Sequence, residues 1–371
     1  MEGRFIDIGG NERRGRSVLV AMSGGVDSAV TALLVKRAGY RSIGITMKNY
    51  CYGDAGVPER SCCSVESVQD ARRECDRLGM PHRVADVTDF FGREVVENFV
   101  SEYENARTPN PCVRCNAVVR FRTLLDQADR LGVEYVATGH YARVFEAANG
   151  ERFLARAADR AKDQSYFLSG VHGETLGRVL FPLGDYDKAT VREVASDAKM
   201  AVAQKKDSQE VCFVPDGTLR SFLDHQGVKL SPGQIENTAG EVVGRHEGLA
   251  PYTVGQRRRI GVSAGVPQYV IELDRGRNVL VVGDPGNLLH KTLTCTLDWA
   301  HPSVIEGGGP LSAQIRYRHA GSEVSDVRID GRAARVSFVE PQRAISPGQT
   351  LALYSGDLLV ASGVIDGVVT P

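Results

Sequence analysis

The first half of the chain alternates short apolar runs with stretches of helical period. The apolar runs, which we predict to be strands, are 17–22, 43–48, 82–87 and 134–138. The stretches of helical period are 28–39, 65–79, 89–107 and 115–131. Pro109 and Pro111 separate the last two, because a residue that precedes proline disfavours helix. Strands that alternate with helices predict an α/β fold with a doubly wound parallel sheet.

The second half of the chain has a different pattern, in which Gly and Pro recur between short β-branched runs from about residue 230. These runs are 291–299, 312–318, 334–339, 351–355 and 358–365. Such a pattern is typical of a small antiparallel barrel. We therefore predict a flexible extension at 1–16, an α/β domain at 17–215, a small mixed linking domain at 216–290 and a C-terminal β-barrel at 291–371.

The composition is that of a globular protein, with 371 residues of which 42% are hydrophobic and 25% charged. No stretch of 18 apolar residues and no apolar run of signal-peptide length is present, so we expect no membrane span and a cytoplasmic protein. Basic residues number 45 and acidic residues 46, and the two signs balance within each predicted domain. Proteins that wrap nucleic acid usually carry a basic surplus, so any nucleic-acid surface here must be local.

A glycine loop, Ser23–Ser28, lies directly between the first predicted strand and the first predicted helix. Gly24 and Gly25 let the backbone turn tightly, and the free amides and dipole of a helix start favour an anion. Asp27 is unexpected beside a phosphate unless a metal ion lies between them. A capped glycine turn without a ligand is the alternative. The loop lacks the lysine of a Walker loop, which argues against a kinase or GTPase.

Three of the eight cysteines lie in segments that suggest chemistry. Cys112 and Cys115 form a CxxC, and Cys212 follows in KKDSQEVCFV. The thiolate is the reactive form, and we expect Cys115 to open a helix, a position that favours the thiolate. Nearby cations would act in the same direction: Arg114, Lys205 and Lys206. A CxxC is as often half of a metal site, but no second CxxC completes a four-cysteine zinc site.

Eight segments then occur in an order that resembles one known family. They are SGGVDS (23–28), GITMKNY (44–50), CCSVESVQDAR (62–72), TPNPCVRCN (108–116), ATGHYAR (137–143), KDQSYFL (162–168), KKDSQEVCF (205–213) and TVGQR (253–257). From about residue 17 to its end the chain resembles the tRNA-uridine 2-sulfurtransferases of the PP-loop ATP pyrophosphatase superfamily. The resemblance implies a PP-loop adenine nucleotide hydrolase domain, a central tRNA-binding domain and a C-terminal β-barrel.

The resemblance implies ATP-dependent 2-thiolation of the wobble uridine of tRNA, with Mg²⁺ beside ATP. ATP would adenylate the oxygen at carbon 2, and pyrophosphate and then AMP would leave. Cys212 would carry the sulfur as a persulfide received from a sulfur-carrier or cysteine desulfurase protein. Cys115 would be its nucleophilic partner, and the two would end as a disulfide that a reductant reopens.

The resemblance also implies a set of binding residues. The ATP site would contain Ala21, Met22, Ser23, Gly24, Gly25, Val26, Asp27, Ser28, Met47 and Gly139. The tRNA contacts would be Asn110, Pro111, Cys112, His140, Lys162, Asp163, Gln164, Arg316, Tyr317, Arg318 and Gln349. Arg316 and Arg318 fall in a predicted strand, where they would share one face. His140 could instead be a core histidine with both ring nitrogens satisfied.

The chain departs from this family at three places. Many members carry Asp where this chain has Cys112, so Cys112, Cys115 and Cys212 could instead be the ligands of a 4Fe–4S cluster with one open iron. The GQRxG pattern of the family is replaced by Arg257–Arg259, which is by default a solvated face and otherwise a salt-sensitive tRNA patch. Glu210 replaces a common glycine, and the sequence does not explain it.

Two other classes of function are compatible with parts of the sequence. The first is a different PP-loop adenylating enzyme that acts on a small molecule, against which the barrel and the paired cysteines argue. The second is a non-catalytic iron–sulfur or RNA-binding protein, which the complete Ser23–Ser28 loop disfavours.

Overall fold

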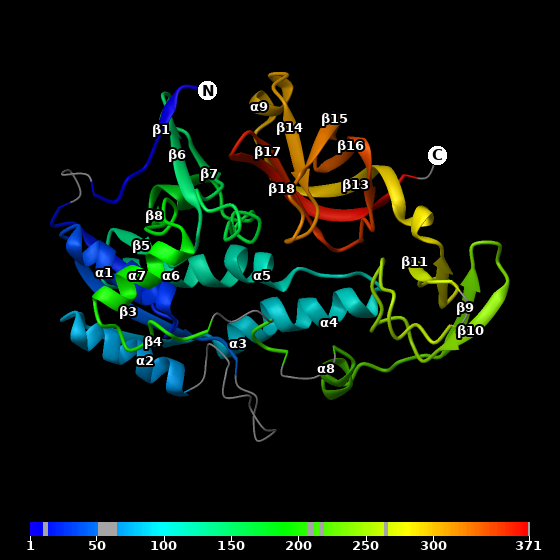
Figure 1. Cartoon of the computed structure of the whole chain (residues 1–371), viewed down its shortest axis with the longest axis horizontal. Helices are drawn as coiled ribbons and strands as arrows, with labels where there is room; N and C mark the ends of the chain where they lie inside the picture. The colour runs from blue at the N-terminus through cyan, green and yellow to red at the C-terminus, as the bar shows by residue number, and fades with distance from the viewer. Residues whose placement is uncertain (10–13, 51–64, 207–210, 215–218, 263–265, 370–371) are drawn as a thin grey trace. The chain divides into compact units, whose positions relative to one another are not determined.

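The computed structural model describes residues 1–9, 14–50, 65–206, 211–214, 219–262 and 266–369. The chain divides into two compact units (Figure 1). The first unit comprises Met1–Val95, Cys112–Asp216 and Asp357–Leu359, and the second comprises Val96–Pro111, Gly217–Gly356 and Val360–Pro371. None of the helices in the described part of the chain combines the length and apolar character that a membrane crossing requires.

A five-stranded parallel sheet forms the centre of the first unit, as the sequence predicts. Its strand order is β4 (His82–Asp86), β3 (Arg41–Lys48), β2 (Ser17–Ala21), β5 (Tyr135–Ala137) and β8 (Val179–Leu180). Every neighbouring pair is parallel. The central strand β2 is almost wholly buried, which explains its continuous apolar run.

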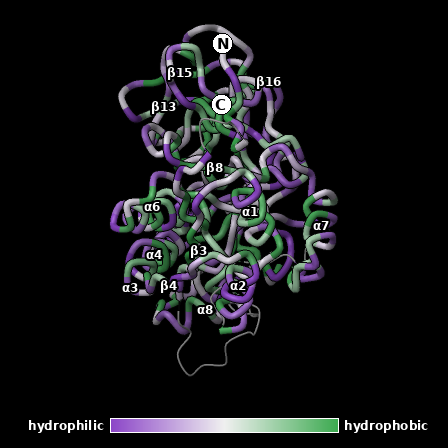
Figure 2. Tube along the Cα trace, turned by 90° about the vertical axis from the view of Figure 1, so that its left-hand side faces the viewer, coloured by the Kyte–Doolittle hydropathy of each residue, from purple (hydrophilic) through white to green (hydrophobic). Residues whose placement is uncertain are grey.

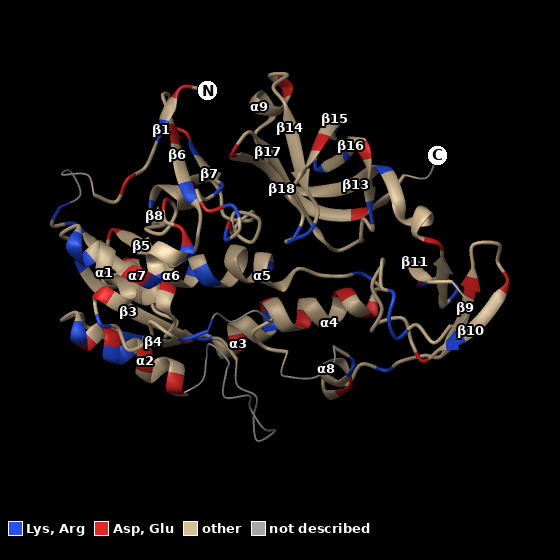
Figure 3. Cartoon of the chain, viewed as in Figure 1, with Lys and Arg blue, Asp and Glu red and all other residues tan. Residues whose placement is uncertain are grey.

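Helices cover this sheet. They are α1 (Val26–Arg37), α2 (Val65–Arg77), α6 (Phe121–Arg130) and α7 (Lys188–Asp197). Side chains of α1 and α2 form one core with Val18 and Val20 of β2, while α6 contacts β2 and β5 and α7 packs on α1. Figure 2 shows that α2 is largely hydrophilic, in keeping with a helix that buries only one of its faces. Figure 3 shows basic and acidic residues interspersed in both units, in keeping with the balanced composition.

An antiparallel hairpin of β6 (Arg143–Ala147) and β7 (Arg152–Ala155) follows the sheet strand β5. The short strand β1 (Gly3–Phe5) pairs with β6, so part of the expected flexible extension is an edge strand. The hydrophobic pattern of the sequence revealed neither the β6–β7 hairpin nor β1, because these strands are short and β1 is fully exposed.

The helix that carries the cysteines begins earlier than expected. It runs without interruption from Pro111 through α5 (Pro111–Arg114) and the π-helical η3 (Cys115–Arg120) into α6. The expectation that Cys115 opens this helix is therefore wrong. Proline suits a first helical position, because its φ is preset and its missing N–H has no partner there in any case. Before it come α3 (Thr88–Phe91), the π-helical η2 (Gly92–Val96) and α4 (Glu97–Glu104), the last of which belongs to the second unit.

The second unit contains a small mixed sheet and a closed barrel. The sheet has the order β10 (Val242–His246), β9 (Gly233–Asn237), β12 (Val279–Gly283) and β11 (Tyr269–Asp274), and α8 (Leu219–His225) precedes it. The barrel strands are β13 (Leu289–Ala300), β14 (Leu311–Gln314), β15 (Ser322–Asp330), β16 (Ala333–Arg343), β17 (Thr350–Ser355) and β18 (Leu358–Val368). Their order β18-β13-β16-β15-β14-β17 closes through a β17–β18 pairing, which confirms the predicted barrel.

Residues 316–318 do not belong to a barrel strand, so that prediction is wrong. Strand β14 ends at Gln314, whose Nε2 donates hydrogen bonds to the carbonyl oxygens of Arg316 (3.2 Å) and Tyr317 (2.9 Å). These bonds fold the chain into a turn. Arg316 and Arg318 therefore do not share a strand face, although Tyr317 and Arg318 are exposed.

Candidate active site

The loop Ser23–Ser28 is preformed at the carboxyl end of β2. Gly24 has a φ of +70°, and a Cβ there would lie 2.2 Å from the carbonyl oxygen of Ser67, so only glycine fits. The Ser28 hydroxyl donates to the Gly25 carbonyl (2.9 Å) and accepts from the Ser23 amide (3.2 Å). Gly25, the residue before α1, makes no side-chain cap. The first amides of α1 thus remain available to an anion.

Asp27, which the sequence left unexplained, is neutralised by a lysine from another helix. Lys188 Nζ lies 2.7 Å from Oδ1 and 2.8 Å from Oδ2 of Asp27, and the Tyr141 hydroxyl donates to Oδ1 at 2.9 Å. The Lys188 side chain is 13% exposed and that of Asp27 is 31% exposed. The loop therefore presents less negative charge to a phosphate than its sequence suggests.

Lys188 was missed by the sequence-based prediction. It is the first residue of α7, after Asp187, whose side chain accepts from the Thr190 amide as a helix cap. The pattern Asp-x-x-Thr marks a helix start. It cannot show that the next residue reaches a loop 161 positions earlier in the chain.

Gly139 explains why the segment after β5 approaches the loop so closely. A Cβ at Gly139 would lie 2.9 Å from the carbonyl carbon of Asp27 and 3.0 Å from the amide nitrogen of Ser28. The backbone of Gly139 therefore packs directly on the start of α1. Met22 and Val26, by contrast, have buried side chains in the core, so only their backbones are available to a ligand. Ala21 and Met47 are half-buried at the ends of β2 and β3.

The segment 162–168 links this loop to the helix that carries the cysteines. Gln164 accepts from the Tyr141 amide through Oε1 (3.0 Å), and Tyr141 also contacts Asp27. At its other end the Phe167 carbonyl accepts from Asn116 Nδ2 (2.9 Å), one residue after Cys115. Hydrogen bonds at the two ends of this segment thus connect it with the loop Ser23–Ser28, through Tyr141, and with the cysteine helix.

Three residues of this segment were expected as tRNA contacts: Lys162, Asp163 and Gln164. The Asp163 carboxylate is directed inward, where it accepts from the amides of Ala157 (2.9 Å) and Ser165 (3.2 Å) and from the Ser165 hydroxyl. Its side chain is 7% exposed. Asp163 therefore organises the segment, and Lys162, which is half-buried, is better placed to meet a ligand.

One short segment, Thr88–Val96, anchors both Cys115 and Cys212. Arg114, next to Cys115, donates to the Glu94 carbonyl (2.7 Å) and carboxylate (3.0 Å). Phe213, next to Cys212, is buried and packs edge-to-face on Phe91 with ring centroids 5.6 Å apart. Phe91 of α3 and Glu94 of η2, both in the first unit, therefore hold the neighbours of two cysteines that lie nearly one hundred residues apart in the chain.

The electrostatic surroundings of these cysteines differ from the expectation. Arg114 is ion-paired with Glu94, and Lys205 with Asp70 at 2.7 Å, so neither cation is reserved for a thiolate. Cys115 is buried, whereas Cys112 and Cys212 are half-buried, and none of the three is in a disulfide. Cys75 and Cys295 lie in apolar cores, where burial raises the pKa of each thiol to about 12. Cys51, Cys62, Cys63, Glu210 and part of segment 205–213 lie outside the described residues.

His140 has both of its ring nitrogens occupied. Arg120 donates to Nε2 (3.0 Å), so the proton is on Nδ1 and is donated to the Thr138 hydroxyl (2.8 Å). The ring also packs on Phe121 and Phe181. Burial, followed by the charge of Arg120, lowers the pKa of His140 to about 3. These contacts favour the alternative of a neutral core histidine over a tRNA contact.

Three of the candidate tRNA residues in the second unit, Gln349, Asn110 and Pro111, lie near one another. Gln349 Nε2 donates to the carbonyl oxygens of Thr108 (3.0 Å) and Pro109 (3.2 Å), directly before Asn110 and Pro111. Thr108 also donates its amide to the Pro347 carbonyl (2.8 Å). Gln349 thus fixes the segment that leads into the cysteine helix.

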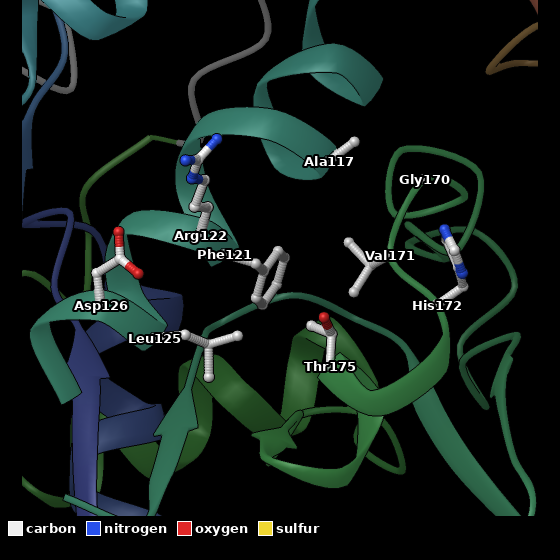
Figure 4. A pocket seen from close by; sticks show the side chains of 9 residues that line it. All are labelled: Ala117, Phe121, Arg122, Leu125, Asp126, Gly170, Val171, His172 and Thr175. Atoms are coloured by element: carbon white, nitrogen blue, oxygen red, sulfur yellow. The ribbon is translucent and has the colours of Figure 1, made fainter. Parts of the chain in front are cut away.

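A cavity of about 340 Å³ lies beside the cysteine helix (Figure 4). In that view Phe121, Leu125, Val171 and Thr175 point toward one another, and Arg122 lies at the rim. The remaining lining residues are Ala117, Asp126, Gly170 and His172. None of the loop residues or cysteines contributes to it, so it is separate from the candidate site.

Among the residues that the structure describes, no three His, Cys, Asp or Glu side chains are grouped to hold a metal ion. Cys112, Cys115 and Cys212 are all among these described residues. The described residues therefore do not confirm a cluster that has all three as ligands.

Three family models match the chain in sequence. They are a tRNA methyl transferase HUP domain at 16–216, a tRNA methyl transferase PRC-barrel domain at 220–284 and an aminomethyltransferase beta-barrel domain at 290–365. Among solved structures, the U34-tRNA thiolase NcsA of Methanococcus maripaludis, with its 4Fe–4S cluster, matches at a TM-score of 0.37 and 17% identity. That match covers 58% of this chain and 66% of the other.

Relatives of this chain are similar to it over almost their whole length. The tRNA-specific 2-thiouridylase of Halothermothrix orenii is 42% identical over 94% of this chain and 98% of its own. That of Heliobacterium modesticaldum is 44% identical over 94% of this chain and 92% of its own. With the preformed loop and the barrel, this similarity shows that the chain belongs to the tRNA-specific 2-thiouridylase family of ATP-dependent sulfurtransferases, which thiolate a uridine of tRNA.

Proposed function

We propose that this chain replaces the oxygen at carbon 2 of the wobble uridine of tRNA by sulfur, at the expense of ATP. The observation that carries the proposal is that one unit holds both a preformed glycine loop and two cysteines, Cys115 and Cys212, whose neighbours Arg114 and Phe213 contact the segment Thr88–Val96. The loop supplies ATP binding, and the thiols supply the sulfur chemistry.

ATP is expected to place its phosphates at the first turn of α1, where the backbone amides and the helix dipole stabilise negative charge. Transfer of AMP to the uridine oxygen converts that oxygen into a leaving group and releases pyrophosphate. Mg²⁺ fits here as a companion of the phosphates, because Mg²⁺ keeps most of its waters and needs few protein ligands. Asp27 is the one carboxylate within the loop Ser23–Ser28.

The sulfur step uses Cys212 and Cys115 in turn. The terminal sulfur of a Cys212 persulfide, supplied by a sulfur-carrier or cysteine desulfurase protein, bonds to carbon 2 as AMP leaves. The Cys115 thiolate then attacks the Cys212 sulfur, so that the S–S bond to the product breaks and a Cys115–Cys212 disulfide forms. A reductant restores both thiols.

We infer that sulfur passes as this persulfide and not through a 4Fe–4S cluster. The support is the arrangement of the described thiols, which does not group Cys112, Cys115 and Cys212 as ligands. The substitution Cys112→Asp separates the two routes, since many relatives carry Asp at this position. It should retain thiolation by the persulfide route, whereas thiolation that is lost together with bound iron and sulfide would establish the cluster.

The tRNA is expected to contact Lys162 in the first unit and the exposed Tyr317 and Arg318 in the second. Asn110, Pro111 and Gln349 are expected to act by fixing the start of the cysteine helix. We place the enzyme in the cytoplasm, where tRNA and reduced thiols coexist.

Single substitutions Cys115→Ser and Cys212→Ser test the catalytic assignment. Each should abolish thiolation by a persulfide donor while tRNA-dependent release of pyrophosphate from ATP persists, because the adenylation step needs neither thiol. Near-normal thiolation by either variant would refute the assigned roles. Pyrophosphate release that requires ammonia or glutamine instead of tRNA would point to a small-molecule adenylating enzyme.

A further inference from the structure

Strand β3 holds the residue that comes directly before the loop Ser23–Ser28. The Met22 amide donates to the Ile45 carbonyl (2.8 Å), which extends the pairing of β2 with β3 by one residue. The Met22 carbonyl accepts from the Thr46 hydroxyl (2.9 Å). Both polar backbone groups of Met22 are therefore bound by β3, one of them through a side chain.

The peptide bond between Met22 and Ser23 is consequently held at both of its polar atoms. Thr46 binds its carbonyl oxygen, and its N–H, which belongs to Ser23, donates to the Ser28 hydroxyl (3.2 Å). The orientation of this peptide plane sets the direction in which the chain enters Gly24, whose φ is +70°. If the plane rotated, the Ser23 amide would leave Ser28, and the loop would lose a bond that closes it.

His82 of β4 directs the Thr46 hydroxyl. His82 Nε2 lies 2.8 Å from Thr46 Oγ1. A carbonyl oxygen can only accept, so Thr46 spends its one proton on Met22, and His82 therefore donates its Nε2–H to Thr46. Burial, followed by the charge of Arg72 and opposed by that of Asp76, lowers the pKa of His82, so the ring is neutral at neutral pH.

This series of hydrogen bonds lies where water cannot replace it. Thr46 is 1% exposed and Met22 is 2% exposed. Gly44 lies on the same face of β3 as Thr46, and a Cβ there would lie 2.4 Å from Cys75 Sγ and 3.4 Å from His82 Cδ2. The side chains of Cys75 and His82 thus fill the space that glycine leaves. A buried carbonyl that lost its donor here would remain unsatisfied, which is costly.

We propose that Thr46, directed by His82, is a positioning residue for ATP, because it holds the Met22–Ser23 peptide in the orientation in which the loop Ser23–Ser28 binds phosphates. The inference rests on the proposed function only in taking ATP as the ligand of this loop. Without the hydroxyl, the loop would populate other orientations of that peptide. The apparent affinity for ATP then falls in proportion to the fraction of molecules with the competent loop.

The substitution Thr46→Val tests the proposal, because valine keeps the shape of threonine and lacks the hydroxyl. The Kd for ATP, measured by calorimetric titration of the full chain, should rise about fivefold, the usual net contribution of one hydrogen bond. In tRNA-dependent pyrophosphate release the KM for ATP should rise by a similar factor. Bound ATP orders the loop, so kcat should stay at the wild-type value. A merely structural role would instead reduce the active fraction and lower kcat without a change in KM.

Conservative variants provide the rescue. Thr46→Ser loses a buried methyl group and keeps the hydroxyl, so its midpoint of thermal unfolding should fall while its Kd for ATP stays at the wild-type value. His82→Leu tests the same series from its other end and serves if Thr46→Val does not fold. Its Kd should rise less than that of Thr46→Val, because the Thr46 hydroxyl still reaches Met22. His82→Gln keeps an N–H donor and should bind ATP better than His82→Leu.

Thr31→Val is the matched control. Thr31 is a fully buried threonine of α1, and its Oγ1 has no hydrogen-bond partner within the described part of the chain. The same change of hydroxyl to methyl should therefore leave the Kd for ATP unchanged. Three results would each overturn the proposal: a wild-type Kd in both Thr46→Val and His82→Leu, an equal rise in Thr31→Val, or an equal rise in Thr46→Ser.

The binding measurement separates this inference from the proposed function. If the wild-type chain thiolates tRNA and neither Thr46→Val nor His82→Leu changes the Kd for ATP, the role of Thr46 is wrong and the proposed function stands. If the wild-type chain binds ATP and does not thiolate tRNA, the proposed function fails, and the Kd of Thr46→Val still decides the role of Thr46. A wild-type chain that binds no ATP would refute both.

Discussion

Lys188 is the residue whose replacement tests most sharply how the phosphate loop tolerates a carboxylate. The change Lys188→Met keeps much of the side-chain length and removes the charge, so the Asp27 carboxylate keeps the hydrogen bond from the Tyr141 hydroxyl but loses its cation. Removing one member of a buried ion pair costs about 3–5 kcal/mol, and an exposed pair contributes about 0.2–1 kcal/mol. With exposed fractions of 13% and 31%, this pair lies between the two, so we expect a loss of about 2 kcal/mol in unfolding free energy.

The effect on ATP should be of similar size. An uncompensated carboxylate about 8 Å from a phosphate charge costs about 2 kcal/mol at an effective dielectric constant of about 20. ATP should therefore bind about 30-fold more weakly to Lys188→Met, since 1.4 kcal/mol corresponds to about a factor of ten. Urea titration measures the first quantity, and calorimetric titration with ATP measures the second.

Two further variants test whether neutralisation of Asp27 is the reason that Lys188 supports ATP binding. Lys188→Arg keeps the positive charge and should retain most of the ATP affinity. The double variant Asp27→Asn with Lys188→Met removes both charges and should recover most of the affinity that Lys188→Met loses. If the double variant binds ATP as weakly as Lys188→Met, neutralisation of Asp27 is not the role of Lys188. Wild-type ATP affinity in Lys188→Met itself would refute the reasoning entirely.

Three more predictions follow from the same geometry. Gly139→Ala should displace the loop backbone and weaken ATP binding, because its Cβ would meet Asp27 and Ser28 backbone atoms, whereas Gly92→Ala, which meets nothing within 4 Å, should bind ATP normally. For His140 the pKa of about 3 in the folded chain lies below the ordinary value of about 6.5, so the unfolded chain takes up the proton first and stability should fall as pH drops from about 6.5 to 3. The contribution of His140 to the slope of unfolding free energy against pH is at most about 1.4 kcal/mol per pH unit. His140→Asn should remove this contribution, which urea titrations at several pH values would measure. A thiol reagent applied to the native chain should label Cys112 and Cys212 before Cys75 and Cys295, because the latter pair is buried with each pKa raised to about 12; early labelling of either, seen by peptide mass mapping, would contradict this.

The sequence predicted the parallel sheet and the barrel because both rest on strong local patterns. Strand β2 is a continuous apolar run before a glycine loop, and the barrel strands are separated by turn residues. Strand β15 was missed because its sequence, SEVSDVRID, is mostly exposed and carries little hydrophobic signal. The turn at 316–318 was taken for strand because a glutamine side chain, and not the period, ends β14.

The candidate site was predictable only where it is local. The loop Ser23–Ser28 could be recognised from glycine spacing and its place between strand and helix. The pairing of Asp27 with Lys188, and the anchoring of Cys115 and Cys212 on Thr88–Val96, join segments far apart in the chain. Such contacts depend on how the sheet and its helices pack, which no local pattern records.

The central claim, thiolation of tRNA at the expense of ATP, is tested most directly by the mass of the nucleosides. Transfer RNA that bears a wobble uridine would be incubated with this protein, ATP, Mg²⁺ and a persulfide donor, then digested and analysed by mass spectrometry. The account predicts that the wobble uridine gains the mass of sulfur for oxygen, only when ATP is present. An unchanged wobble uridine, under conditions in which a tRNA-specific 2-thiouridylase of the family modifies the same tRNA, would contradict it.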